Sequence, residues 1–210
     1  MSKVLYVKAS PRGERSFSIG VADAFLDEYR QRHPDDVVEE IDLFSAGLPA
    51  FGALEAKGKY SIIYGKEGSP EAKEAWRRVE TVIEAFKSAD RYVFSVPMWN
   101  FGIPYVLKHY IDVITQPTYT FAVGPTGYEG LVKGKRAFVA FARGGTYSEA
   151  SGAKSMDHQK PYFEQALGFM GITDVHSVVV EGTLGGPDSA QAILEEAKGK
   201  TESDAGEAEA

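Results

Sequence analysis

A serine-rich loop follows the first apolar run of the chain and has the residues of an anion site. The run at residues 4–7 leads into KASPRGERSFS, residues 8–18, and a helical pattern starts there. Ser10, Ser16 and Ser18 supply hydroxyls, and the amide of Phe17 lies in the expected first helical turn. Amides at a helix N-terminus lack acceptors within the helix and attract anions. The loop therefore predicts phosphate binding, although serine is also an ordinary helix cap.

Two later loops have residues suited to a flat ring. In PMWNF, residues 97–101, large apolar side chains surround Asn100, whose amide offers donors and acceptors. In ARGG, residues 142–145, the glycines let the backbone approach a ligand closely. A core-packed turn and a simple glycine turn are the alternative interpretations. Taken together, the loops favour a ligand with a phosphate at one end and an aromatic group at the other.

The spacing of apolar residues predicts the elements that carry these loops. We expect strands at about 4–7, 37–43, 91–96, 136–142 and 175–180. We expect helices at 16–32, after Ser69 and Pro104, around residues 162–170 and after Pro187. Residues 44–69 are expected to be irregular, and residues 116–134 to form a loop or small hairpin. Strands alternating with helices predict an α/β fold, a doubly wound five-stranded parallel sheet with helices on both faces. Ligands of such sheets bind at the carboxyl ends of the strands, where all three loops lie.

Composition excludes several classes of function. The chain has 210 residues, no cysteine and a net charge of −7, which argues against thiolate chemistry and against general nucleic-acid binding. No apolar run reaches the length of a membrane span, and no secretory signal is evident, so a cytoplasmic protein is expected. The four histidines are scattered, so no metal is expected, and His109 is expected on the solvated side of its helix.

The motifs together resemble the FMN-dependent NADH azoreductases, also described as quinone reductases, of the flavodoxin-like superfamily. The resemblance spans residues 3–197. Its matching stretches are residues 8–18, 97–101, 107–112 (LKHYID), 120–121, 129–131, 143–145 and 168–175 (GFMGITDV). It implies a flavodoxin-like FMN-binding domain over residues 1–198. The remaining residues 199–210, GKTESDAGEAEA with no large apolar side chain, are expected to be a disordered acidic tail.

The resemblance also implies site residues. Tightly but non-covalently bound FMN would have its phosphate held by Ser10, Ser16, Phe17 and Ser18. Its ring system would lie along Met98, Trp99, Asn100 and Phe101, with its pyrimidine side against Ala142, Arg143, Gly144 and Gly145. Family members often have Ser or Thr in place of Ala142, so only backbone contacts remain at that position.

The implied reaction is a ping-pong cycle. NADH or NADPH gives a hydride to flavin N5 and leaves, and a quinone or azo compound then takes two electrons. The amides of Asn100 and Gly145 would stabilise negative charge on the ring. The resemblance implies a homodimer with active sites at the interface. Phe121, Val123 and Tyr128 would border the substrate pocket, where Val123 and Tyr128 depart from common family residues.

Two other functions remain open. A flavodoxin-type electron carrier would bind FMN without turning over a small molecule. A ligand-sensing or partner-binding module would have no activity, and the unexplained residues 44–69 are its only support. Tyr119 and Tyr128 are conceivable proton donors, but surface tyrosines are the simpler interpretation.

Overall fold

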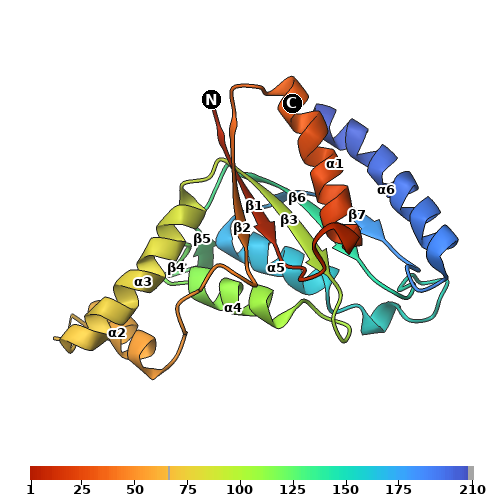
Figure 1. Ribbon diagram of the computed structural model, residues 1–210. Coiled ribbons are helices and arrows are strands. Elements are labelled where there is room, and N and C mark those ends of the chain that lie inside the picture. Colours follow the sequence, from red (N-terminus) through yellow and green to blue (C-terminus); the bar gives the residue numbers. More distant parts are fainter. Residues whose placement is uncertain (66, 208–210) are drawn as a thin grey trace.

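Five parallel strands form the central sheet (Figure 1), in a computed structural model that describes residues 1–65 and 67–207. Their order is β2-β1-β3-β6-β7, and every neighbouring pair is parallel. This confirms the expected doubly wound sheet, with the flavodoxin-like order in which the first strand lies between the second and third. The strand bounds are β1 Lys3–Lys8, β2 Val37–Asp42, β3 Arg91–Pro97, β6 Arg136–Ala142 and β7 Asp174–Val180.

Helices cover both faces of the sheet, as Figure 1 shows. Helices α1 (Phe17–Arg32) and α6 (Pro187–Glu207) pack together on one face. Helices α3 (Pro70–Lys87), α4 (Tyr105–Ile114) and α5 (Lys160–Met170) supply the core of the other. Strands β3 and β6 are buried along almost their whole length because apolar side chains meet a helix layer on each side. The sheet therefore holds its strand ends, and the loops after them, on a rigid base.

Local signals set the starts of the helices. Ser16 caps α1, with its Oγ accepting from the amide of Ile19 at 3.4 Å. Ser69 caps α3 in the same way, accepting from the amide of Ala72 at 3.2 Å, and Pro70 follows in the first turn. Both starts agree with the sequence analysis. Short 3₁₀ turns precede α1 (Gly13–Arg15) and α5 (Lys154–Met156).

The expectation that residues 44–69 are irregular was wrong in part, because helix α2 spans Ala53–Ile63. Its sequence has one unfavourable feature, Gly58 in its middle. Tertiary packing overrides it: a Cβ on Gly58 would lie 2.4 Å from the carbonyl oxygen of Ala72, so α2 contacts the backbone of α3 directly. Lys66, in the same stretch, lies outside the described residues.

The hairpin expected within residues 116–134 is present as β4 (Phe121–Gly124) and β5 (Gly127–Gly130). At the other end of the chain, residues 199–207 continue helix α6, whereas disorder was expected from Gly199. The buried side chains of Ala197 and Thr201 explain the difference, since they extend the packed part of the helix past that glycine. Residues 208–210 lie outside the described residues. No helix in the described part of the chain is both long and apolar enough to cross a membrane.

Candidate functional site

The three loops singled out by their sequence leave the sheet at the same edge. Backbone hydrogen bonds join them there: the amide of Ala9 donates to Ser95 at 3.1 Å, and the amide of Met98 donates to Ala142 at 2.7 Å. In Figure 1 this edge lies at the lower right, where the arrowheads of β1, β3 and β6 end. The position is the one at which doubly wound sheets bind ligands.

The first loop presents hydroxyls and free amides at the N-terminus of α1. The hydroxyls of Ser16 and Ser18 lie 3.1 Å apart and are buried, and Ser10 is also buried. Among the described residues, no group accepts from the amides of Phe17 or Ser18. A 16-residue helix adds its dipole to these donors. The arrangement suits a phosphate group.

The second loop is a tight turn with a strained tip. Trp99 and Gly102 bond to each other in both directions, at 2.9 and 3.0 Å. Asn100 (φ 47°) and Phe101 (φ 71°) both have left-handed backbones, which bulky residues rarely adopt. The rings of Trp99 and Phe101 stay 37% and 43% exposed, so the turn is not packed into the core. Their apolar surface is available to a ligand or a partner.

The third loop has its arginine turned inward. The guanidinium of Arg143 is only 3% exposed and lies 2.7 Å from Asp157 and 3.4 Å from Glu181. Its backbone amide donates to Val180 and its carbonyl accepts from Thr183, so the backbone of Arg143 is engaged within the protein, whereas the buried Nε of its side chain has no hydrogen-bond partner among the described residues. The contact of Arg143 with the cofactor stays a prediction. The carbonyl oxygen of the buried Ala142 likewise accepts a hydrogen bond within the protein, from the amide of Met98.

Four backbone amides at this edge remain unused. In the part of the chain that the structure describes, no acceptor is found for the amides of Asn100, Phe101, Gly144 and Gly145. Met98 and Trp99, in contrast, already donate within the protein. The carbonyl of Gly144 accepts from Leu184, whose side chain lies where a Cβ on Gly144 would be, 2.6 Å away. These four free amides are therefore suited to donate hydrogen bonds to the polar edge of a heterocycle.

The surroundings of the first loop are charged and compact. A pocket of about 390 Å³ lies beside Ser10, between Lys8, Asp23 and Phe44. Burial raises the pKa of Asp23, and the nearby Lys8 ammonium opposes that shift. Ser16, Ser18, Asn100 and Gly144 do not line this pocket. The loops therefore share an edge and hydrogen bonds, and this pocket belongs to the first loop alone.

The hairpin residues expected at the substrate pocket lie elsewhere. Phe121 and Tyr128 pack on Phe169 near the C-terminal end of α5, with ring centroids 4.8 and 5.3 Å from it. That end of α5 leads into the start of β7, at the opposite edge of the sheet from the three loops. Val123 and Tyr128 are exposed. Within one chain the structure does not bring Phe121, Val123 and Tyr128 to the site.

Two other side chains differ from expectation. His109 is half-buried, and a nitrogen of its ring lies 2.9 Å from the carbonyl oxygen of Pro49, so it is not simply solvated. Tyr119 donates to Glu80 and lies against Trp76 on α3, away from the strand ends. Burial, together with that carboxylate, raises the pKa of Tyr119.

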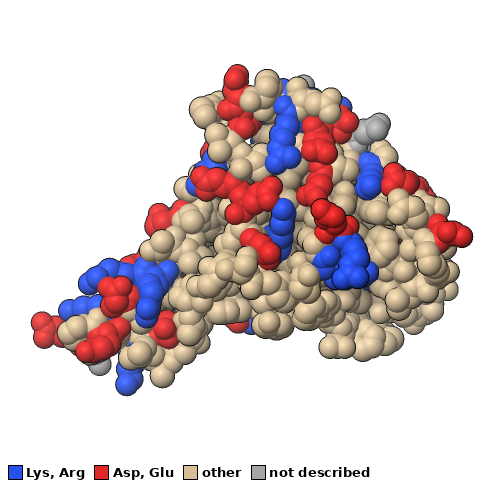
Figure 2. Space-filling model, viewed as in Figure 1, with Lys and Arg blue, Asp and Glu red and all other residues tan. Residues whose placement is uncertain are grey.

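Sequence reasoning missed three aromatic residues at the site. Phe44 lies 5.9 Å from Trp99 and 6.0 Å from Tyr105 between ring centroids, and Tyr147 lies 6.4 Å from Phe101. Phe44 and Tyr147 follow strand ends at the ligand edge, and Tyr105 begins a helix there. Those positions are the signal by which sequence analysis could have found these residues. Figure 2 shows that the surface over α4 and this edge carries few charged side chains.

Comparison with known proteins decides the family. The model of the flavodoxin-like fold family matches residues 2–204. A curated relative, the FMN-dependent NADH:quinone oxidoreductase of Nitratidesulfovibrio vulgaris, is 50% identical over 198 residues, which cover 94% of this chain and 95% of the relative. The chain belongs to the FMN-dependent NADH:quinone oxidoreductase family.

Solved structures place this quinone oxidoreductase family member among azoreductases. An azoreductase from Bacillus anthracis strain Sterne superposes with a TM-score of 0.90, at 35% identity, over 98% of this chain and 99% of that one. An FMN-dependent NADH-azoreductase from Bacillus anthracis strain Ames Ancestor, solved in complex with FMN, gives 0.89 at 29% identity, over 99% of both chains. The resemblance drawn from the motifs is confirmed, and the flavodoxin-like sheet of the family is the one observed here.

Proposed function

We propose that this protein is an FMN-dependent NADH:quinone oxidoreductase that also reduces azo compounds. The observation that carries the proposal is the set of unpartnered amides at one sheet edge, at the start of α1 and in the two loops after β3 and β6. The 50% identical relative of the same name and the azoreductase structures support it. The names of these relatives favour a reductase over a flavodoxin-type electron carrier.

The first loop fits the phosphate of FMN. Ser10, Ser16 and Ser18 would donate through their hydroxyls, and Phe17 and Ser18 through their amides. Hydrogen bonds to a charged group contribute roughly 1.5–3 kcal/mol each. Several of these bonds together with a covered ring support tight, non-covalent binding. Arg12 is exposed, and its guanidinium lies 5.8 Å from the centroid of the Phe17 ring at the same helix start.

The second and third loops fit the ring system. Met98, Trp99 and Phe101 would cover its apolar part, and the amides of Asn100, Phe101, Gly144 and Gly145 would meet its polar edge. When bound, FMN supplies two-electron transfer between the donor and the quinone or azo acceptor. The protein itself would hold hydrogen-bond donors where negative charge develops on the ring system. Preorganised backbone amides stabilise such charge. Arg143 would act by fixing the third loop rather than by touching the ring.

NADH is the proposed donor, and NADPH remains a second candidate for the same role. No acid or base of the protein is required, since solvent protonates the products. The donor and the acceptor would use one position in turn, as in a ping-pong reaction.

A homodimer would complete the site. Large apolar residues on and around α2 are exposed, a feature that suits an interface. They are Phe51, Leu54, Tyr60, Ile62, Ile63 and Tyr64. In this proposal the partner's hairpin brings its own copies of Phe121, Val123 and Tyr128 to the open edge of the first chain. We further propose a cytoplasmic protein with no nucleic-acid or membrane partner, in keeping with its net charge of −7.

The central test is flavin retention followed by turnover. Protein saturated with FMN is passed through a gel-filtration column, and the retained flavin is then assayed with NADH and menadione or an azo dye. We expect about one flavin per chain and steady NADH oxidation that depends on the acceptor. Loss of all flavin on the column would contradict the proposal. Photoreduction separates the carrier alternative, since a carrier accumulates a stable one-electron form and a reductase does not.

A further inference from the structure

A buried glutamine joins the start of α5 to the end of β3. The Nε2 of Gln159 donates to the carbonyl oxygen of Val96 at 2.9 Å, directly before the loop at residues 97–101. The side chain of Gln159 is 0% exposed. The carboxylate of Asp157 accepts from the amide of Gln159 at 3.0 Å and fixes the backbone at this helix start. The glutamine therefore holds the base of the second loop from a rigid element.

The two residues before this glutamine hold both of the loops proposed for the flavin ring. The amide of His158 donates to the carbonyl of Phe101, at the tip of the second loop, at 2.9 Å. The carboxylate of Asp157 pairs with Arg143 of the third loop at 2.7 Å. Phe101 has a φ of 71°, and such a strained backbone persists only where its surroundings hold it in place. Three consecutive residues thus set the spacing of the two loops.

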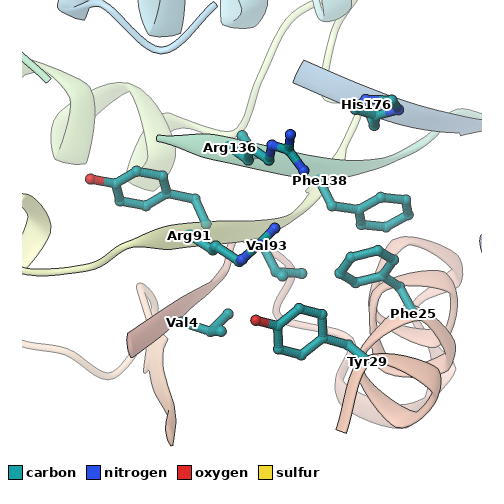
Figure 3. Close-up of a pocket in the computed structure, with 10 residues that line it drawn as sticks. Val4, Phe25, Tyr29, Arg91, Val93, Arg136, Phe138 and His176 are labelled. Atoms are coloured by element: carbon teal, nitrogen blue, oxygen red, sulfur yellow. The ribbon is translucent and has the colours of Figure 1, made fainter. Parts of the chain in front are cut away.

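Gln159 is an unfavourable residue for packing alone. Its Oε1 is buried and has no hydrogen-bond partner in the part of the chain that the structure describes. A buried acceptor without a partner destabilises a fold, whereas an apolar side chain of the same length avoids that cost. Elsewhere the same sheet is packed by apolar rings: Phe25 on α1 lies on Phe138 of β6, with centroids 4.0 Å apart (Figure 3). A polar group that costs stability is expected where function requires it.

We propose, on the basis of the function proposed above, that Gln159 is a positioning residue for the flavin ring. It acts through the carbonyl of Val96, which fixes the second loop relative to the third. In that function the free amides of both loops donate to one ring system. Such donors bind reduced FMN, with its greater negative charge, more strongly than oxidised FMN, and so raise its reduction potential. The effect depends on the spacing of the loops, because a displacement of about 1 Å weakens preorganised contacts severely.

Gln159→Met tests the proposal, since it removes the donor and the unpaired acceptor together and keeps the length of the side chain. We expect the FMN-loaded variant to retain one flavin per chain and to unfold in urea at the same midpoint or a higher one. Its preference for reduced over oxidised FMN should fall roughly tenfold, which lowers the reduction potential by about 30 mV, measured by equilibration with redox dyes. The kcat/KM for NADH should fall by a similar factor. Gln165→Met makes the same change at an exposed position of α5 and should alter none of these quantities.

Gln159→Glu provides a conservative rescue that depends on pH. When protonated, the new carboxyl group donates to the carbonyl of Val96, and when ionised it has no hydrogen to donate. Burial raises the pKa of such a group. The difference in reduction potential from the unaltered protein, measured at the same pH, should therefore be small at about pH 6 and grow toward about pH 9. A residue that only fills space would give no such trend.

Hydrogen exchange in the full-length protein without FMN tests the contact apart from the flavin. The amide of Met98 donates to Ala142 at 2.7 Å and so joins the second loop to the third. We expect this amide to exchange roughly tenfold faster in Gln159→Met, because the second loop is no longer held at its base. The amide of Val132, which donates to Met170 at the other end of α5, is the reference and should not change.

Three results would overturn the proposal: an unchanged reduction potential in Gln159→Met, an equal change in Gln165→Met, or unchanged exchange at Met98. Failure of the proposed function is recognised separately, because the unaltered protein would then retain no FMN. Exchange at Met98 would still decide whether Gln159 holds the loop.

Discussion

The guanidinium of Arg143 and the carboxylate of Asp157 form a buried ion pair 2.7 Å apart that ties two loops of the flavin edge to a helix. One oxygen of Asp157 binds Arg143, and the other accepts from the amides of Gln159 and Lys160 at the start of α5. Glu181, on the loop after β7, adds to the pair at 3.4 Å and also accepts from the amide of Tyr147. The third loop, the start of α5 and the loop after β7 therefore share one electrostatic link.

Replacement of Arg143 should loosen this link. Arg143→Met leaves the carboxylate of Asp157 buried without its partner, and the loss of one member of a buried pair costs about 3–5 kcal/mol. We expect a fall of about 3 kcal/mol in the free energy of unfolding, measured in urea, and weaker binding of both FMN and riboflavin. Arg77→Met, which breaks an exposed pair with Glu74, should change neither quantity. An unchanged stability in Arg143→Met would contradict the assigned role.

The serines at the start of α1 should discriminate between phosphorylated and unphosphorylated flavin. Ser16→Ala combined with Ser18→Ala removes two hydroxyl donors, and we expect FMN affinity to fall at least tenfold while riboflavin affinity changes little. Fluorescence titration measures both. Loss of the Ser16 cap also costs about 1 kcal/mol of stability. Ser69→Ala is the control, because it removes an equivalent cap from α3 and should leave both affinities unchanged. Equal losses for the two flavins would argue against a phosphate role.

Two substitutions of Asn100, in the strained turn after β3, distinguish the role of its backbone amide from that of its side chain. Asn100→Gly keeps the amide and suits the left-handed conformation, so FMN binding should stay within about threefold. Asn100→Val places a β-branched residue at a positive φ, which costs about 1–3 kcal/mol. We expect at least tenfold weaker FMN binding in Asn100→Val, measured by ultrafiltration. A large loss in Asn100→Gly would show instead that the side chain is essential.

Asp36 should make stability depend on pH in the acid range. The amide of Ser2 donates to its carboxylate and lowers the pKa of Asp36, and the hydroxyl of Tyr29 donates at 2.7 Å. Because the folded-state pKa lies below the unfolded value of about 3.9, the carboxylate stabilises the fold fully above that pH. This contribution is lost as the pH falls through the folded-state pKa.

Asp36→Asn should therefore be less stable by about 1 kcal/mol at pH 6, with the deficit shrinking toward pH 2. Urea unfolding at several pH values measures it. Asp27→Asn, at an exposed position on α1, is the control and should show no such trend. A deficit that is the same at pH 6 and pH 2 would rule out the carboxylate as its source.

The sequence alone was sufficient for the architecture because its signals were local. Ser16 and Ser69 as caps, the continuous apolar runs of β3 and β6, and Pro187 at the start of α6 each act through neighbouring residues. Because the strands are parallel, their carboxyl ends lie at one edge of the sheet, and the three loops that follow them lie there too. The sequence did not reveal α2, because Gly58 is a poor helix former and only its contact with α3 makes the helix favourable.

Tertiary structure decided which groups at the site are available. The sequence could name Arg143 but not its direction, and only long-range pairing with Asp157 and Glu181 turns it inward. In the same way, the order of the motifs along the chain indicates that Phe121 and Tyr128 belong to the site. Their packing on Phe169 places them instead at the opposite edge of the sheet. Local sequence preferences determine where a helix or strand begins. The partner of a buried charge or ring depends on residues that are distant in sequence, so a local sequence pattern does not specify it.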